Sequence, residues 1–168
     1  MDMIEKARIF ATAAHAAVGQ LRKYTNEPYI VHPTEVANIV RGVPGTTPEM
    51  ISAAYLHDTV EDTNITADTL REEFGDEITE LVIWLTDVSK PEDGNRATRK
   101  AIDLAKVALA PPNAQTIKLA DIISNITSIV EHDPDFAIIY LKEKRAQLEV
   151  LKEGNQELYK IEIGRAHV

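Results

Sequence analysis

The sequence contains no cysteine. Disulfide bonds and thiolate metal sites are therefore excluded, so any metal ion must be held by histidine, aspartate or glutamate. No apolar run approaches the ~20 residues that a membrane-spanning helix requires. The first residues include acidic side chains and lack the basic start of a secretory signal. These absences are typical of a soluble domain in a reducing compartment, and we expect a cytoplasmic protein with no membrane partner.

Positive charge is also scarce. Lysine and arginine total 18 against 27 aspartates and glutamates, which gives a formal net charge of −9. Proteins that bind polymeric nucleic acid usually carry a basic face, so we do not expect such a partner. A small anionic ligand remains compatible, because it needs only a local group of cations. Composition leaves the oligomeric state open between a monomer and a homodimer.

Apolar residues recur at helical spacing in nearly every segment, and no segment alternates convincingly with period two. We therefore expect an all-α single domain, a helical bundle that covers residues 1–161. Residues 162–168, with His167, read like a translated vector sequence and are predicted to be a non-native tail. Residues 88–97 are the best candidate for a mobile loop. The helices are expected over 3–19, from 33 onward, and over 48–60, 67–74, 76–87, 96–109, 114–130 and 135–152, with a short helix after 154.

The most informative stretch is 53–63, where an apolar run ends in metal-ligand and acid/base side chains. If this stretch is helical, His57 lies one turn before Glu61, and Asp58 lies one turn before Asp62. Carboxylates at this density repel one another and lose hydration, so a divalent cation is the simplest compensation. The alternative is a solvated helix end. The apolar lead-in and the second acidic pair favour a site.

Other candidates are weaker when each is taken alone. Asp121 lies in an apolar helix, but an ordinary polar helix face explains it slightly better, since polar residues recur there at Lys118, Asp121, Asn125 and Ser128. His32 begins a helix, yet a lone histidine is more often an ordinary residue than a ligand. The same caution applies to His15, which suits a packed residue or one that supports a ligand.

A basic pair, Arg22 and Lys23, lies in a loop beside the aromatic residues Tyr24 and Tyr29. Cations that bind phosphate and a planar group that stacks on a base would suit a phosphorylated nucleotide. Solvated loop charge explains the pair equally well. The pair by itself therefore leaves the ligand open.

Several blocks follow one another in a distinctive order and spacing. They are Ala14-His15-x3-Gly19-Gln20-x-Arg22-Lys23, Pro28-Tyr29-Ile30-x-His32-Pro33, Ala53-Ala54-x-Leu56-His57-Asp58-Thr59-Val60-Glu61-Asp62-Thr63, Phe74-Gly75 and Ile117-Lys118-Leu119-Ala120-Asp121-x3-Asn125. Their arrangement resembles the HD-superfamily hydrolase domain of the RelA/SpoT proteins, and the resemblance runs over about residues 5–152. The small size, with no room for a synthetase or regulatory domain, resembles the stand-alone small alarmone hydrolases, whose animal members are the Mesh hydrolases.

The resemblance implies an all-helical, Mn²⁺-dependent hydrolase that removes the 3′-pyrophosphate of ppGpp or pppGpp and yields GDP or GTP with pyrophosphate. It implies a set of metal ligands, His32, His57, Asp58 and Asp121. It assigns activation of the attacking water to Glu61 and Asp62. It places the nucleotide against Arg22, Lys23 and Asn125, and it places substrate phosphate near Tyr140 and Lys144. A metal held in this way would tie three helices together.

The sequence departs from the family pattern at Ile122, where RelA/SpoT members usually carry a basic residue. Two alternatives therefore stay open. One is an HD phosphohydrolase that acts on another nucleotide, such as NADPH losing its 2′-phosphate. The other is a non-catalytic module that binds alarmone, which the intact Glu61-Asp62 pair disfavours.

Overall fold

The computed structural model describes the backbone of residues 1–166 and the side chains of residues 1–161. Within this range the chain is helical, and its only β pairing is an isolated bridge between Leu21 and Pro28. The all-α fold is thereby confirmed. His167 lies outside the described residues, and the extent of the domain and of the tail stays a prediction. No helix in the described part of the chain is long and apolar enough to cross a membrane.

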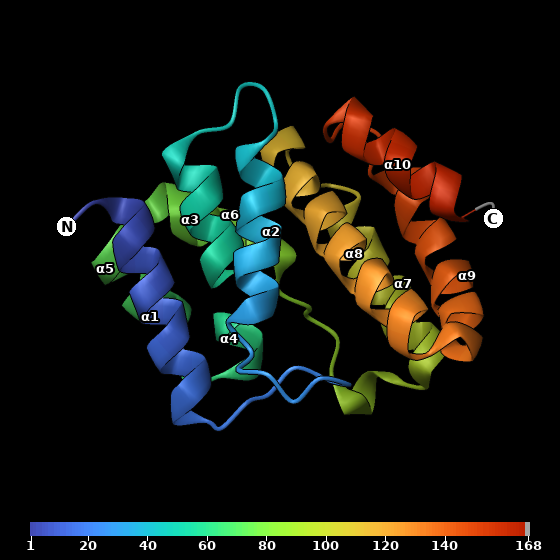
Figure 1. Cartoon of the computed structure of the whole chain (residues 1–168), viewed down its shortest axis with the longest axis horizontal. Helices are drawn as coiled ribbons and strands as arrows, with labels where there is room; N and C mark the ends of the chain where they lie inside the picture. Colours follow the sequence, from blue (N-terminus) through green and yellow to red (C-terminus); the bar gives the residue numbers. More distant parts are fainter. Residues whose placement is uncertain (167–168) are drawn as a thin grey trace. The chain divides into compact units, whose positions relative to one another are not determined.

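The chain divides into two compact units, one that ends at Thr86 and one that begins at Asp87. The helices of the first unit are α1 (Met3–Ala17), α2 (Val31–Arg41), α3 (Pro48–Leu56), α4 (Thr59–Asp62), α5 (Ala67–Phe74) and α6 (Asp76–Leu85). Within this unit α3 packs against α1, α2 and α6, and Figure 1 shows α1 and α2 beside it.

Helix α3 can occupy the middle of the unit because of its small side chains. Ala53 and Ala54 are fully buried, and the helices that pack on α3 contribute fully buried residues of their own, among them Ala7 of α1 and Val36 of α2. Small residues let the helix axes approach closely without leaving voids. The hydroxyl of Thr47 caps the N-terminus of α3 by accepting a hydrogen bond from the backbone N–H of Met50. The apolar run thus carries its C-terminal end into the interior.

The prediction of one helix over 48–60 is wrong in one respect: α3 ends at Leu56, and α4 begins at Thr59. Local side chains make the break. The ring Nδ1–H of His57 donates to the carbonyl of Ala54 at 2.7 Å, and the hydroxyl of Thr59 donates to the carbonyl of Leu56 at 2.8 Å. These side chains take up the carbonyls at the end of the helix, so the backbone can turn there. The turn contains His57 and Asp58.

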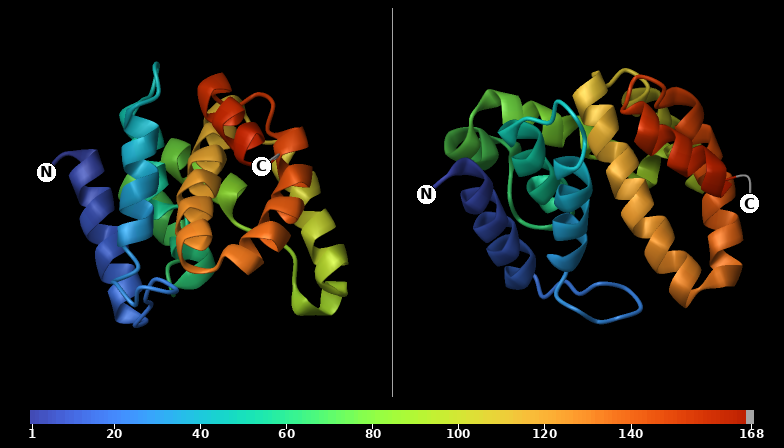
Figure 2. Two further views of the ribbon diagram at one scale, coloured as in Figure 1. Left: turned by 45° about the vertical axis from the view of Figure 1, so that its right-hand side comes forward. Right: turned by 45° about the horizontal axis from the view of Figure 1, so that its top comes forward.

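The second unit contains a 3₁₀ turn, η1 (Pro91–Asp93), followed by α7 (Arg96–Val107), α8 (Pro112–His132), α9 (Pro134–Val150) and α10 (Gln156–Ala166). Helices α8 and α9 pack together, as Figure 2 shows. The single residue Asp133 joins them. Helix α10 packs on both, and α7 packs on α9. The carboxylate of Asp133 caps α9 by accepting from the N–H of Phe136. This turn reverses the chain between its two longest helices.

Hydrogen bonds tether both ends of the 88–97 loop. The backbone N–H groups of Val88 and Ser89 donate to Oδ1 of Asp103 at 2.9 and 3.0 Å. At the other end the side chain of Asn95 caps α7 by accepting from the N–H of Thr98. The loop is therefore anchored to α7 at both ends, and its mobility stays a prediction.

Candidate functional site

Two buried histidines converge on one carboxylate in the first unit. His32 lies in the first turn of α2, and His57 follows the last residue of α3. Their Nε2 atoms lie 3.7 and 3.1 Å from the same atom, Oδ2 of Asp58. One ligand atom from each of these residues lies within 4.8 Å of the others. The two histidines are 1% and 2% exposed, so the cluster lies inside the protein.

Hydrogen bonds from and to two of these residues, His57 and Asp58, orient their side chains. Because Nδ1 of His57 carries the proton donated to Ala54, the neutral ring has its lone pair on Nε2, which faces the cluster. The hydroxyl of Tyr29 donates to Oδ2 of Asp58 at 2.6 Å. Sequence reasoning noted Tyr29 only as an aromatic residue beside the basic pair and missed this contact, although Tyr29 stands in the same block as His32.

This set of donors fits a divalent cation of the first transition series. Imidazole nitrogen and carboxylate oxygen, without thiolate, are ligands that Mn²⁺, Fe²⁺ and Zn²⁺ accept. A cation between the imidazole nitrogens and Oδ2 would also balance the negative charge of the half-buried Asp58. The residues present in the first unit therefore suit a metal ion.

A second group of carboxylates adjoins Asp58. Carboxylate oxygens of Asp58, Glu61 and Asp62 lie within 4.8 Å of one another, and the last two residues are exposed. The side-chain amide of Gln20 donates to Oδ2 of Asp62 at 3.2 Å. Partial desolvation, followed by the charge of Asp58, raises the pKa of Asp62 above its ordinary value. A carboxylate with a raised pKa is a stronger base, which suits proton transfer near neutral pH.

Asp121 lies on α8 in the second unit and is 7% exposed. Nζ of Lys118 is 3.1 Å from its Oδ2, and the amide of Asn125 donates to its Oδ1 at 3.2 Å. Burial acts to lower the pKa of Lys118, but the carboxylates of Asp121 and Asp87 outweigh it and raise that pKa above its ordinary value. Both carboxylate oxygens of Asp121 are therefore oriented, on a helix face that is largely buried.

The second unit also encloses a cavity of about 570 Å³. Cationic side chains outnumber carboxylates among its lining residues: Arg96, Lys100, Lys118, Lys142 and Lys144 against Asp87, Asp103 and Glu143. Such a cavity suits an anionic group, even though the protein as a whole is acidic.

Lys144 is the most unusual of these cations. It is 9% exposed, and its Nζ donates to Oε1 of Gln147 at 2.9 Å and lies 5.1 Å from the centre of the Tyr140 ring. Burial, followed by the positive charge of Lys118, lowers the pKa of Lys144 to about 7. An anion entering the cavity would favour its charged form.

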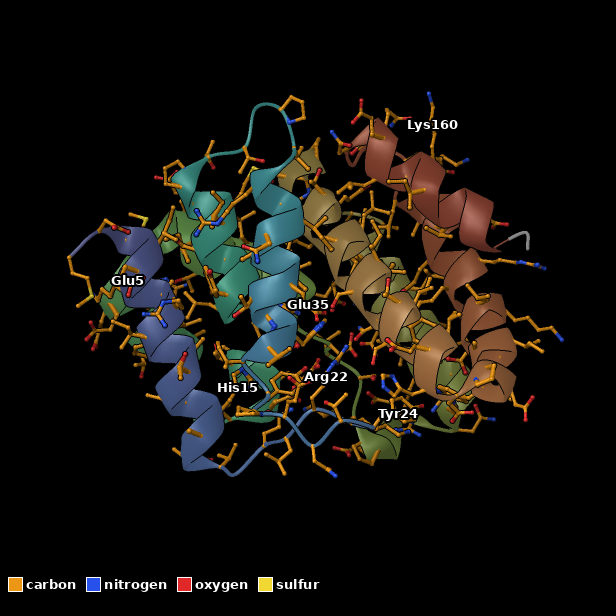
Figure 3. All side chains as sticks on the ribbon, viewed as in Figure 1. Glu5, His15, Arg22, Tyr24, Glu35 and Lys160 are labelled. Atoms are coloured by element: carbon orange, nitrogen blue, oxygen red, sulfur yellow. The ribbon has the colours of Figure 1, made fainter. Side chains whose placement is uncertain are left out.

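The predicted basic pair belongs neither to the ligand cluster nor to the residues that line the cationic cavity. Arg22 and Lys23 lie on the loop after α1, where Nζ of Lys23 sits 5.2 Å from the centre of the Tyr24 ring. Figure 3 shows Arg22 and Tyr24 on this loop, beyond the C-terminal end of α1.

Ile122, the departure from the family pattern, is fully buried in the second unit. Its side chain is therefore packed and does not line the cationic cavity.

The fold and the buried ligand cluster define a helical domain that can hold a divalent metal ion. Residues 7–149 match the family model described as HD domain, so the chain belongs to the HD domain family. A probable GTP pyrophosphokinase of Mycobacterium leprae is 38% identical over 130 residues, which are 77% of this chain and 16% of that protein. A guanosine-3′,5′-bis(diphosphate) 3′-pyrophosphohydrolase of Aquifex aeolicus is 32% identical over 128 residues, 76% of this chain and 18% of that protein. The chain thus spans less than a fifth of the length of these relatives.

One solved structure matches nearly the whole chain. It belongs to a metazoan orthologue of SpoT that hydrolyses ppGpp, and it superposes with a TM-score of 0.85 over 99% of this chain and 94% of that one. The two sequences are 24% identical, so this similarity shows a shared fold. The expected resemblance to the HD hydrolase domain of the RelA/SpoT proteins is thereby confirmed.

Proposed function

We propose that this protein is a Mn²⁺-dependent hydrolase that removes the 3′-pyrophosphate from ppGpp or pppGpp. The observation that carries the proposal is the convergence of two buried imidazole nitrogens on Oδ2 of Asp58, with Glu61 and Asp62 beside it. The name of the Aquifex aeolicus relative supports the choice of substrate. The partner is then a free nucleotide, and the cysteine-free, acidic sequence supports a cytoplasmic location.

His32, His57, Asp58 and Asp121 are the proposed metal ligands. The first three converge within the first unit. Asp121 is proposed as the fourth ligand because it matches the family motif and because Asn125 and Lys118 hold its carboxylate in one orientation. When bound, the metal ion would lower the pKa of a water molecule and neutralise charge on the diphosphate.

Glu61 and Asp62 are the proposed catalytic bases. Both carboxylates lie within 4.8 Å of Asp58, and the raised pKa of Asp62 suits a group that accepts a proton near neutral pH. One of them takes a proton from water as the water oxygen bonds to the phosphorus attached to the ribose 3′ oxygen. The bond between that phosphorus and the 3′ oxygen breaks, and the 3′ oxygen leaves with a proton. The products are GDP or GTP and pyrophosphate.

Arg22, Lys23, Asn125, Tyr140 and Lys144 are the proposed substrate-binding residues. The cations compensate the charge of a nucleotide that carries several phosphates, which an acidic protein would otherwise repel. Lys144 lines the cationic cavity of the second unit, with its ammonium group against the Tyr140 ring. The burial of Ile122 supports a role in packing, so this departure gives no reason to prefer NADPH.

The test of the proposal is a product assay with ppGpp and Mn²⁺, analysed by ion-exchange chromatography, beside a parallel incubation with NADPH. We expect GDP and pyrophosphate from ppGpp. Glu61→Gln should lower kcat about 100-fold or more, as expected for loss of a general base. The matched control is Glu72→Gln, an exposed residue of α5, which should keep wild-type activity. Preferential release of phosphate from NADPH, or binding of ppGpp without turnover, would contradict the proposal.

The fourth ligand needs its own test. Asp121→Asn keeps the size of the side chain but removes its negative charge, so Mn²⁺ should bind about 10- to 100-fold more weakly. Isothermal titration of the protein with MnCl₂ measures this. Asp135→Asn, at an exposed position of α9, is the control. Unchanged Mn²⁺ affinity in Asp121→Asn would remove Asp121 from the ligand set.

A further inference from the structure

We propose that His15 and Gln20 form a positioning pair, in which the His15 ring fixes the side-chain amide of Gln20 so that Gln20 holds the carboxylate of Asp62 in place. Neither His15 nor Gln20 belongs to the metal ligands, the catalytic bases or the substrate contacts assigned above. The inference rests on the proposed function, in which Asp62 accepts a proton from water.

The contacts form a continuous path within the first unit. Nδ1 of His15, on α1, lies 2.7 Å from Oε1 of Gln20. The amide nitrogen of Gln20, in the loop that follows α1, donates to Oδ2 of Asp62 in α4 at 3.2 Å. Figure 3 shows His15 near the C-terminal end of α1, the end from which this loop leaves. A residue of α1 is thereby linked to a carboxylate 47 positions later by way of a single side chain.

The burial of His15 determines which ring nitrogen carries the proton. His15 is 1% exposed, and its Nε2 has no hydrogen-bond partner among the described residues. A proton on Nε2 would leave a buried N–H unpaired, which costs free energy, whereas a proton on Nδ1 is donated to Gln20. Burial also lowers the pKa of His15, which keeps the ring neutral with a single proton. The stable tautomer is therefore Nδ1–H.

That proton decides which way the Gln20 amide faces. Oε1 accepts from Nδ1–H of His15, so the NH₂ group is left to face Asp62. The opposite orientation would place the NH₂ group against the Nδ1–H donor and Oε1 against a carboxylate, which pairs like with like at both ends. His15 therefore selects the amide orientation that offers Asp62 a donor. Without His15, only the Asp62 carboxylate would favour this orientation.

The backbone around Gln20 supports the same geometry. The N–H of Gln20 donates to the carbonyl of His15 at 3.1 Å, and the N–H of Tyr29 donates to the carbonyl of Gln20 at 3.2 Å. Gly19 turns the chain between the end of α1 and Gln20, with φ of +66°, a conformation that glycine adopts readily. The backbone of Gln20 is therefore held at both its N–H and its carbonyl, which fixes the position from which the side chain extends.

The His15 ring also lies beside Tyr29. Its centre lies 4.6 Å from that of the Tyr29 ring, and the Tyr29 hydroxyl donates to Asp58. One buried ring therefore contacts both Gln20, which donates to Asp62, and Tyr29, which donates to Asp58. Because these carboxylates repel each other, Asp62 would swing towards solvent without a donor to hold it. The expected consequence of losing the pair is a slower chemical step at unchanged metal and substrate affinity.

Two substitutions separate positioning from packing. Gln20→Glu keeps an acceptor for His15 but replaces the donor to Asp62 with a second carboxylate. We expect kcat for ppGpp to fall about 10- to 100-fold, as for a misplaced catalytic group, while KM, Mn²⁺ affinity and Tm stay close to wild type. His15→Phe should give a similar loss, and His15→Asn, whose amide can donate to Gln20, should recover most of it. The matched control is His132→Phe, at an exposed position of α8, which should keep wild-type kcat.

The double variant His15→Phe/Gln20→Glu should be no slower than the slower single variant, because both changes interrupt one path. Wild-type kcat in Gln20→Glu, or multiplied losses in the double variant, would overturn the positioning role.

A measurement without turnover keeps this inference distinct from the proposed function. ¹⁵N NMR of the histidine rings in the wild-type protein at pH 7 should show His15 as the neutral Nδ1–H tautomer, and Gln20→Leu should alter its Nδ1 shift. An Nε2–H tautomer or an imidazolium would overturn the pair, whether or not the protein hydrolyses ppGpp. If wild type does not hydrolyse ppGpp, the proposed function fails together with the role assigned to Asp62.

Discussion

The hydroxyl of Tyr29 donates a 2.6 Å hydrogen bond to Oδ2 of Asp58, the same oxygen on which Nε2 of His32 and Nε2 of His57 converge. Tyr29 therefore holds the carboxylate oxygen that faces both histidines. We predict that Tyr29→Phe weakens Mn²⁺ binding about 10- to 100-fold, the usual effect of losing a hydrogen bond to a ligand. Titration with MnCl₂ measures this, and Tyr159→Phe on α10 is the control. Equal affinities in wild type and Tyr29→Phe would show that the contact does not orient the ligand.

Metal removal should lower the thermal stability of the protein. A metal that binds His32 and His57 links α2 to the end of α3, and binding to the folded state alone stabilises that state. We predict a lower Tm in EDTA than in MnCl₂, measured by calorimetry. His57→Ala should lose the difference between the two conditions. If the wild-type Tm is the same in both, then no metal binds the folded protein under these conditions.

The folding stability should depend on pH through Lys144. Its pKa is about 7 in the folded protein, against an ordinary value of 10.5. Between these values the unfolded chain binds a proton that the folded chain lacks, so the free energy of unfolding rises with pH across this window. Lys144→Met removes this dependence and should stabilise the protein at pH 7 by roughly a few kcal/mol. Urea denaturation at pH 7 and pH 9.5 should show the advantage shrinking at the higher pH, whereas a constant difference would refute the lowered pKa.

Gly154 should tolerate no side chain, because the turn before α10 closely approaches α8. A Cβ at Gly154 would lie 2.7 Å from Cδ1 of Leu119 and 3.2 Å from backbone atoms of Gln115 and Thr116. We predict that Gly154→Ala lowers the free energy of unfolding by about 1 to 3 kcal/mol, the usual cost of overpacking.

Gly42→Ala is the matched control for that substitution. Gly42 has φ of −76°, and a Cβ there would meet its nearest neighbour, the carbonyl oxygen of Ile39, at an ordinary 3.5 Å. Alanine at this position should be neutral or slightly stabilising. Equal effects at Gly42 and Gly154 in urea denaturation would argue against the close approach.

The helices were largely predictable because each buries an apolar stripe that recurs at helical spacing. The break at His57 was not, since the apolar run gives no sign of it. The turn depends on hydrogen bonds from the His57 and Thr59 side chains, which periodicity does not register. The prediction of one continuous helix failed at the point where the chain places two of its proposed metal ligands, His57 and Asp58.

The site was predictable as a set of residue types and not as a set of contacts. One short block contains His57, Asp58, Glu61 and Asp62. Their density in the sequence was enough to identify them as candidate site residues. Tyr29 is 29 positions from Asp58, and Gln20 is 42 positions from Asp62. Contacts over such separations depend on how the loop after α1 folds back. Only the family blocks in that loop signalled that it belongs to the site.

The most direct test of the central claim is the product of ppGpp hydrolysis by the wild-type protein and by Asp58→Asn, each with MnCl₂ and with EDTA. We predict that wild type with Mn²⁺ releases GDP and pyrophosphate in equal amounts, and that EDTA or Asp58→Asn abolishes both products. Release of other products, or turnover of ppGpp by wild type in EDTA at the rate seen with Mn²⁺, would contradict it.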